Sequence, residues 1–139
     1  LFFGQVASFH PVIASQPGGI TDGFYTFAQF DTPSKSSCSE EICNWIDKYE
    51  SLFGNTPNIG SAYGYMYMDV TARALEIAGH NLTTDSFITA LESIKDYKIP
   101  FGESILSWGP DKHLGANDAF LFVVQDGKFI PVDDVLYTY

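Results

Sequence analysis

Residues 62–79 carry apolar side chains at a spacing of three to four positions, and no proline interrupts them. This spacing predicts a helix with one apolar face, which spans residues 58–78 when the preceding turn is included. Gly79, followed by two polar residues, is typical of a left-handed residue at a helix C-terminus. Gly64 is a poor helix former, so we expect it in a frayed first turn or at a close contact. The side chains predicted to face the core are Tyr63, Tyr67, Val70, Ala74 and Ile77.

A second helix is predicted to begin after Ser39 and to run to about Phe53. Ser39 is a favoured N-cap residue, and Glu40 and Glu41 occupy the first turn, where the helix dipole favours negative charge. The glycine-rich and proline-containing segment that follows ends the helix. The side chains predicted to form its buried stripe are Ile42, Trp45, Ile46, Tyr49, Leu52 and Phe53.

A third helix is predicted over residues 85–95, with Thr84 as its cap and with Phe87, Ile88, Leu91 and Ile94 pointing inward. Shorter apolar runs predict strands at residues 1–3, 24–30, 104–108, 119–124 and 129–132. The first of these is expected to be buried, and the run 24–30 is apolar on both faces, which favours a strand between layers. Asp126-Gly127 predicts a hairpin turn between the last two strands. Residues 4–15 fit a short helix only if Pro11 lies near its start.

The mixture of long helices and short strands predicts an α/β fold. Its order is unusual, because three predicted helices follow one another without a strand between them. Only some of those helices can cover a sheet made by this chain alone. The chain also opens within the apolar run Leu-Phe-Phe-Gly, which suggests a fragment or a processed chain. We therefore expect a fold that is incomplete on its own and that dimerises, swaps elements or pairs with a missing N-terminal part.

The charge balance limits the possible partners. Seventeen acidic residues against seven basic ones give a formal net charge of −10, so binding to nucleic acid or to an anionic membrane surface is disfavoured. Hydrophobic residues make up 45% of the chain and charged residues 17%, as in globular proteins. No run of about 18 apolar residues is present, so no membrane-spanning helix is predicted.

The two cysteines, Cys38 and Cys43, lie five positions apart. Their spacing differs from C-x-x-C, and no histidine nearby suggests a zinc site. Two interpretations remain: a local disulfide in an oxidising compartment, or two unrelated thiols in the cytosol. The small, even number of cysteines in an acidic domain favours the disulfide.

The sequence contains no catalytic motif for which a reaction can be named, and it predicts neither an enzyme nor a cofactor or metal site. The three histidines lie in separate predicted loops without metal-ligand spacing. Adjacent acids such as Asp133-Asp134 are typical of solvated faces. The chemistry that remains is at the start of the helix 58–78, where Asn58, Gly60, Ser61 and Tyr63 combine free N–H groups with a hydroxyl and a phenol. Such an end can receive a carboxylate or another polar ligand group.

Several segments in series resemble the C-terminal portion of periplasmic solute-binding proteins of the branched-chain amino acid ABC-transporter type, which have the type I periplasmic binding fold. They are an aromatic-rich helix ending in ALEIAG, the helix TDSFITAL, the turn PFG and the strand pair FLFVVQDGKFIPV. Upstream, GGITDGFYTFAQF is similar to the strand that leaves the second lobe in this family. The resemblance covers nearly the whole chain and rests on order and spacing. Met66 departs from it, because the family usually carries a small residue there.

The resemblance implies a fragment of a fold with two doubly wound α/β lobes, which are joined by three crossovers and close on a ligand by a hinge. Residues 1–28 would belong to the second lobe, residues 29–117 to the first, and residues 118–139 would return to the second. The family's N-terminal portion, with most of each sheet, would be absent from this chain.

The role that the resemblance implies is the extracytoplasmic solute-binding component of an ABC importer, which binds a small amino-acid-like or carboxylate ligand between two lobes. It would lie in the periplasm or outside the cell, with a membrane permease as its partner. An extracellular ligand-sensing domain of a receptor with the same fold is the alternative. A small hydrolase-like α/β enzyme is disfavoured, because the chain lacks a nucleophile motif.

The resemblance also indicates ligand contacts between the lobes. The second lobe would contribute the loop after its strand, with Gln5, Val6 and Ala7. Amino-acid binders commonly place an acid near the position of Val6, because a desolvated ammonium group needs acceptors, and no acid is present here. The first lobe would contribute the four residues that begin the helix 58–78. We therefore expect a ligand that need not carry an α-ammonium: a small carboxylate, an amide or an aromatic acid.

Overall fold

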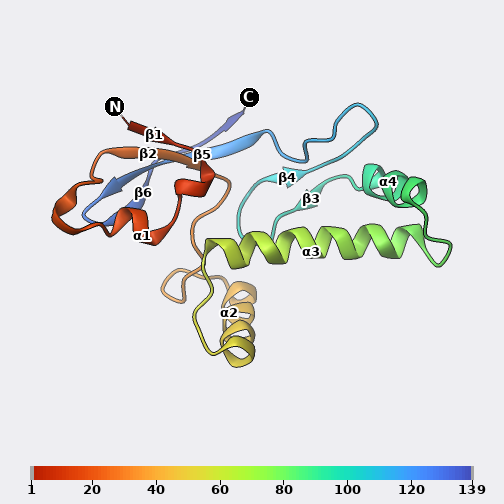
Figure 1. Cartoon of the computed structure of the whole chain (residues 1–139), viewed down its shortest axis with the longest axis horizontal. Coiled ribbons are helices and arrows are strands. Elements are labelled where there is room, and N and C mark those ends of the chain that lie inside the picture. Colours follow the sequence, from red (N-terminus) through yellow and green to blue (C-terminus); the bar gives the residue numbers. More distant parts are fainter. Residues whose placement is uncertain (1, 139) are drawn as a thin grey trace. The chain divides into compact units, whose positions relative to one another are not determined.

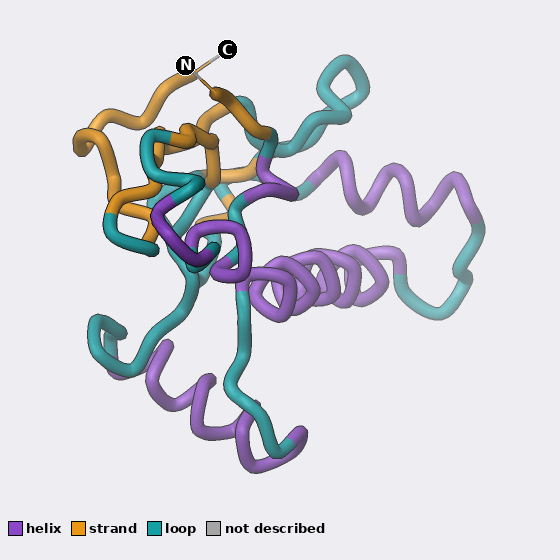
Figure 2. The backbone as a smooth tube through the Cα atoms, turned by 60° about the vertical axis from the view of Figure 1, so that its left-hand side comes forward, coloured by secondary structure: helices purple, strands orange, loops and turns teal. Residues whose placement is uncertain are grey.

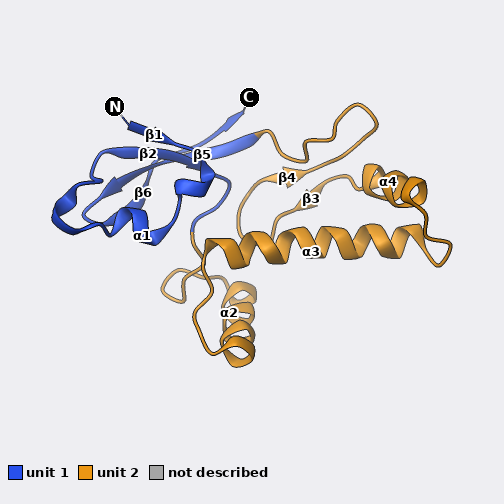
Figure 3. Cartoon of the chain, in the orientation of Figure 1, with its two compact units in different colours: residues 1–31, 118–139 blue, residues 32–117 orange. Residues whose placement is uncertain are grey.

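The computed structural model describes residues 2–138, and the chain divides into two compact units. Unit 1 contains residues 1–31 and 118–139, and unit 2 contains residues 32–117 (Figure 3). Unit 1 is therefore built from the two ends of the chain. Assignment of these units to the second and first lobes of a larger fold stays a prediction.

Unit 1 is a four-stranded mixed sheet in the order β1-β2-β5-β6 (Figure 1). Strand β1 (Phe2–Gly4) is parallel to β2 (Phe24–Ala28), whereas β5 (Asp118–Gln125) is antiparallel to β2 and to β6 (Lys128–Thr138). Asp126 and Gly127 join β5 to β6 with φ angles of 51° and 77°. Two positive φ angles in a two-residue loop match the twist of a hairpin, so the predicted turn is confirmed.

The connection from β1 to β2 contains short helical turns, which Figure 2 shows beside the strands of unit 1. They are a 3₁₀ turn at Val6–Ser8, the short helix α1 (Pro11–Ala14) and a second 3₁₀ turn at Pro17–Gly19. Pro11 is the first residue of α1, as predicted, because that position needs no N–H donor. This crossover is what lets β1 and β2 run in parallel.

The core of unit 1 is centred on Phe9, which is 1% exposed. Its ring lies 4.5 Å from the ring of Phe122 and 4.5 Å from that of Phe129, measured between centroids. The prediction that the first strand is buried is wrong: Phe2 and Phe3 are 77% and 56% exposed, because β1 is an edge strand with one neighbour. Leu1 lies outside the described residues.

Unit 2 contains three helices and a small hairpin. Helix α2 (Glu40–Phe53) begins after Ser39, whose hydroxyl accepts a hydrogen bond from the N–H of Ile42, and ends at Gly54 with φ 70°. Both bounds agree with the sequence prediction. Its predicted buried stripe is wrong in large part, because only Ile46 of the six residues is buried. Leu52 is 66% exposed and Phe53 is 62% exposed.

Helix α3 (Ile59–Ala78) is the longest element, and Gly79 ends it with φ 71°. Its buried side chains are Ile59, Ala62, Met66, Val70 and Ala74. The predicted stripe is therefore wrong in part, because its early positions lie one residue after the buried ones. Tyr67 and Ile77 are 60% and 56% exposed, and only Val70 and Ala74 were assigned correctly. Large aromatic side chains misled the prediction, because the small residues of this helix are the ones that pack closely.

Helix α4 (Thr84–Ser93) packs against α3 and is capped by Thr83, not by Thr84. The hydroxyl of Thr83 accepts from the N–H of Ser86 at 3.1 Å, and the hydroxyl of Ser86 accepts from the N–H of Thr83 at 2.9 Å. The hairpin of β3 (Tyr97–Lys98) and β4 (Ile105–Leu106) follows. The strand β3 was not predicted, and β4 is shorter than the predicted strand 104–108.

Candidate functional site

The helix N-terminus that the sequence singles out is organised by a reciprocal cap in unit 2. The side-chain oxygen of Asn58 accepts from the N–H of Ser61 at 3.1 Å, and the hydroxyl of Ser61 accepts from the N–H of Asn58 at 3.3 Å. This is a capping box, which satisfies two of the donors that a helix start leaves open. The N–H groups of Ile59 and Gly60 have no acceptor among the residues that the structure describes.

The hydroxyl of Ser61 has a second partner, because it donates a hydrogen bond to the phenol oxygen of Tyr49 in α2 at 3.0 Å. Ser61 therefore joins the start of α3 to α2 as well as capping its own helix. Gly60 is exposed, and a Cβ at this position would lie 3.1 Å from the side-chain oxygen of Asn58. A side chain at residue 60 would press on the cap, which favours glycine here.

Tyr63, the fourth predicted contact of this set, is half-buried. Its ring stacks with the ring of Tyr67 one turn further along α3, with 5.9 Å between centroids. The structure thus gathers Asn58, Gly60 and Ser61 in one turn, and it places the Tyr63 ring against a neighbouring aromatic side chain.

The other predicted set lies in unit 1. Gln5, Val6 and Ala7 are exposed and form the start of the 3₁₀ turn after β1. The carbonyl of Gln5 accepts from the buried hydroxyl of Thr26 at 3.0 Å and from the N–H of Ser8 at 2.8 Å, so its backbone is fixed. Its carboxamide has no hydrogen-bond partner among the described residues. A rigid backbone with an uncommitted amide is suited to ligand contact.

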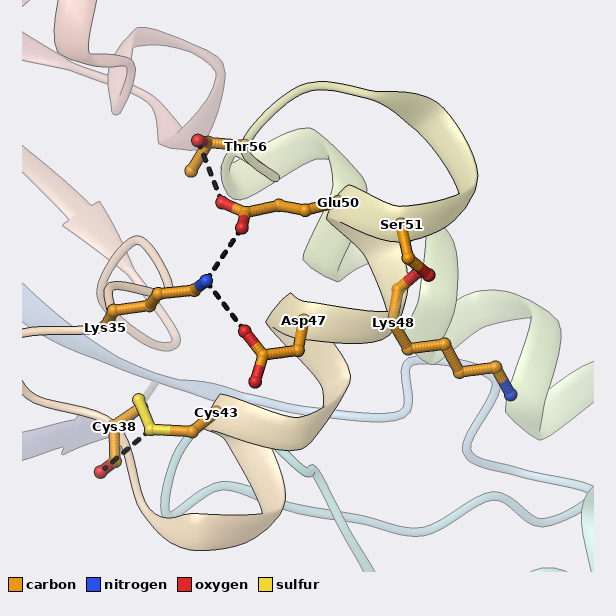
Figure 4. Close-up of polar contacts among 8 residues, drawn as sticks. All are labelled: Lys35, Cys38, Cys43, Asp47, Lys48, Glu50, Ser51 and Thr56. Atoms are coloured by element: carbon orange, nitrogen blue, oxygen red, sulfur yellow. Dashed lines mark hydrogen bonds and ion pairs between the residues drawn. A yellow bond between two sulfur atoms is a disulfide. The ribbon is translucent and has the colours of Figure 1, made fainter.

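The two cysteines form a disulfide at the start of α2, as the sequence favours. Beside it, Lys35 reaches both Asp47 and Glu50 of α2 with Nζ to carboxylate distances of 2.7 Å each (Figure 4). Glu50 also accepts from Thr56 at 3.1 Å, so one carboxylate links the segments before and after α2. The hydrogen bonds with Asp47 and Glu50 raise the pKa of Lys35 to about 12, and the Lys35 hydrogen bond lowers the pKa of Glu50.

A third polar cluster joins α3 to β3. The hydroxyl of the buried Tyr97 donates to Asp69 at 2.8 Å, and Arg73 lies 2.9 Å from the same carboxylate. The Arg73 guanidinium also lies 5.0 Å from the centre of the Tyr97 ring. Burial, followed by the hydrogen bond with Asp69, raises the pKa of Tyr97, so its phenol stays protonated. The cluster therefore fixes α3 on the hairpin rather than presenting a reactive group.

An open groove in unit 2 was not predicted. It has a volume of about 570 Å³, and α2 and the first half of α3 form its walls. Ser61, Tyr49 and Trp45 lie on its lining, as does Gly64, whose missing side chain leaves open space. The expectation that Gly64 is frayed or in close contact is wrong, because it lies within α3 and no described atom is within 4 Å of the place of its Cβ.

Residues 2–138 contain no group of three or more His, Cys, Asp and Glu side chains arranged to hold a metal ion. No helix within those residues is long and apolar enough to cross a membrane.

The pattern of the whole sequence decides the family. A family model of periplasmic binding proteins matches residues 2–128, which is most of the chain. The chain belongs to the periplasmic binding protein family. No curated protein matches the chain.

Solved structures show the same fold for this periplasmic binding protein. A branched-chain amino acid ABC transporter protein from Thermus thermophilus with bound valine matches with a TM-score of 0.79 and 16% identity, over 99% of this chain and 39% of the other. A fatty acid ABC transporter substrate-binding protein from Thermomonospora curvata gives 0.74 and 18%, over 99% and 36%. A solute-binding protein of an ABC transporter from Rhodopseudomonas palustris BisB5 in complex with 3,4-dihydroxybenzoic acid gives 0.67 and 19%, over 98% and 36%.

The chain spans less than two fifths of the length of each of these structures. It is thus a part of the larger two-lobed periplasmic-binding fold, as the resemblance in its sequence predicts. At these identities the structures establish the fold and leave the ligand open.

Proposed function

We propose that this periplasmic binding protein is the extracytoplasmic solute-binding component of an ABC importer and that it hands a small ligand to a membrane permease. The family match carries the proposal, and the comparison structures are ABC-transporter proteins for an amino acid, a fatty acid and an aromatic acid. Binding and release then constitute its activity, and it is not an enzyme.

The ligand that we propose is a small carboxylate, amide or aromatic acid without an α-ammonium group. At the start of α3, the open N–H groups of Ile59 and Gly60 and the positive end of the helix dipole favour an anionic oxygen. In the loop after β1, the carboxamide of Gln5 can donate or accept one hydrogen bond. Residues 4–9 contain no acid that would hold an ammonium group.

Within this proposal the residues have different tasks. Gln5 supplies the polar contact of unit 1, and Val6 and Ala7 supply apolar contact. Asn58, with the cap that it forms, orders the N–H groups at the start of α3. Gly60 leaves room beside them, and Ser61 or Tyr63 supplies a hydroxyl.

A thermal-shift screen of the full-length protein tests the proposal. The screen compares leucine and valine with benzoate, hydroxybenzoates and short aliphatic acids. We expect acids without an ammonium group to raise the melting temperature, because only the ligand-bound native state gains binding free energy.

Calorimetry on Gln5→Ala then assigns the contact, with Gln16→Ala as a control in the same unit. Loss of one hydrogen bond to a charged ligand should weaken binding by about tenfold in Gln5→Ala alone. Tight binding of leucine or valine that Gln5→Ala leaves unchanged would show that this assignment of the ligand is wrong.

A further inference from the structure

Residues 34–38, which we call the strap, precede α2 and lie along one face of that helix. The strap is joined to α2 at three positions: at Cys43 by the disulfide, and at Asp47 and Glu50 by the ion pairs of Lys35 (Figure 4). These positions are four and three residues apart, so they share one face of the helix. None of the three lines the apolar groove, so the strap lies on another face of α2.

The strap also has a local turn, but this turn does not reach α2. The N–H of Ser37 donates to the carbonyl of Ser34 at 3.2 Å, and the N–H of Ser36 donates to the hydroxyl of Ser34 at 3.3 Å. Among the described residues, the polar and covalent contacts between the strap and α2 therefore come from Lys35 and from the disulfide. Loss of one of these two attachments leaves the other to hold the strap.

The two attachments favour each other. Lys35 lies three residues before Cys38, and its ion pairs involve no sulfur, so they can also form in the dithiol form of the protein. A strap that is already held at Lys35 loses less conformational freedom when Cys38 joins Cys43. Conversely, the disulfide keeps Lys35 near its carboxylates. Such a coupling is reciprocal, so an attachment that strengthens the other is strengthened by it to the same extent.

We propose that Lys35 is a positioning residue for the disulfide: its ion pairs hold Cys38 beside Cys43 and shift the thiol–disulfide equilibrium of the pair toward the disulfide. The exchange partner is a small-molecule disulfide. Two protein thiols and one small disulfide give the protein disulfide and two small thiols, so electrons and protons balance. Lys35 takes no part in this exchange and acts only through the position of Cys38. The strap is thus attached to α2 in a redox-sensitive way.

The exposure of the ion pairs sets the size of the effect and makes it depend on salt. The side chain of Lys35 is 51% exposed and that of Asp47 is 65% exposed, so dissolved ions screen their attraction. The shift should therefore be a few-fold at low salt and should disappear at high salt. Reduction leaves the strap held by these ion pairs alone, so its release from α2 depends on salt as well as on the redox conditions.

Redox titration of the full-length protein tests the proposal. The protein is equilibrated with mixtures of oxidised and reduced glutathione, and differential alkylation followed by mass spectrometry measures the oxidised fraction of the peptide that carries both cysteines. We expect Lys35→Gln to lower the equilibrium constant for disulfide formation by about fivefold at low salt. At a sodium chloride concentration of about 1 M, the parent value should fall to that of Lys35→Gln, and the value of this variant should change little.

Further variants separate the ion pairs from net charge. Glu50→Gln removes a negative charge where Lys35→Gln removes a positive one, but both break the same pair, so both should shift the equilibrium toward the dithiol. The double variant should shift it no further than Lys35→Gln alone. Lys48→Gln changes the charge of α2 outside the cluster (Figure 4) and should stay within about twofold of the parent value. An unchanged equilibrium in Lys35→Gln, or shifts of opposite sign in Lys35→Gln and Glu50→Gln, would overturn the proposal.

Discussion

Gln5 in unit 1 and Ser61 in unit 2 are both predicted to contact the ligand, but they differ in how many hydrogen bonds their side chains make within the protein. The Ser61 hydroxyl caps α3 and donates to Tyr49, whereas the Gln5 carboxamide has no partner among the described residues. A side chain that makes no hydrogen bond within the protein can bind a ligand without loss of folding stability. The structure therefore shows that Ser61 organises the helix start, and the ligand contact of Gln5 stays a proposal that its uncommitted carboxamide supports.

The largest expected effect is on the support of the Gln5 loop. Phe9→Ala removes a ring that is 1% exposed and packs on Phe122 and Phe129, so it should destabilise unit 1 by about 3–5 kcal/mol. Both tryptophans of the chain lie in unit 2. Hydrogen exchange of unit 1 peptides should accelerate strongly, whereas the unfolding midpoint of unit 2, followed by tryptophan fluorescence, should change little. An equal loss of stability in both units would contradict this division.

Removal of the disulfide should lower the stability of unit 2. Cys38 and Cys43 close a small loop, so the paired variant Cys38→Ser/Cys43→Ser should lower the free energy of unfolding by about 2 kcal/mol. Urea unfolding followed by tryptophan fluorescence measures it. If the ion pairs of Lys35 alone hold this segment on α2, the variant will unfold at the same urea concentration as the parent chain.

Substitution of the two compared residues is the next test. Ser61→Ala removes half of a capping box and one hydrogen bond to Tyr49, so it should cost about 1 kcal/mol of stability. Gln5→Ala and Ser51→Ala, a matched change in α2, should each stay within about 0.5 kcal/mol of the parent chain. Equal destabilisation by Gln5→Ala and Ser61→Ala would remove the distinction between them.

The smallest effect is expected from the ion pairs of Lys35. The pKa of Glu50 is lowered in the folded state, so its contribution is present above the ordinary pKa of a glutamate and is lost as the pH falls through the folded value. The pKa of Lys35 is raised to about 12, so its contribution is lost only as the pH rises toward that value. The Lys35 side chain is 51% exposed and that of Glu50 is 32% exposed, so solvent screens the pair and both slopes should be shallow. Glu50→Gln should abolish the acid slope in urea titrations.

The sequence predicted features that depend on local chemistry. Ser39 and Gly54 mark the ends of α2 because caps and left-handed glycines act within one turn, and Asp126-Gly127 specifies its hairpin for the same reason. The buried face of α3 was mispredicted, because Ala62 and Met66 pack in place of the tyrosines. That choice depends on which neighbours approach the helix, and spacing alone does not contain it.

The candidate site was predictable to a similar extent. The pattern Asn58-x-x-Ser61 is a signal for a reciprocal cap, and it could have been read from the sequence. The bond from Ser61 to Tyr49 and the groove beside it could not, because they join α2 and α3 through their relative orientation. The uncommitted amide of Gln5 also emerged only when the bonds of its neighbours were known.

Uptake by cells tests most directly whether this chain serves an importer. The measurement follows a radiolabelled acid that raises the melting temperature of the full-length protein, in cells with the gene deleted and in cells complemented by the parent gene or by the Gln5→Ala variant. Deletion should abolish high-affinity uptake, and Gln5→Ala should restore it only at higher ligand concentration, in proportion to its weaker binding. Uptake that continues unchanged in the deletion strain would contradict the account, even if the protein binds the acid tightly.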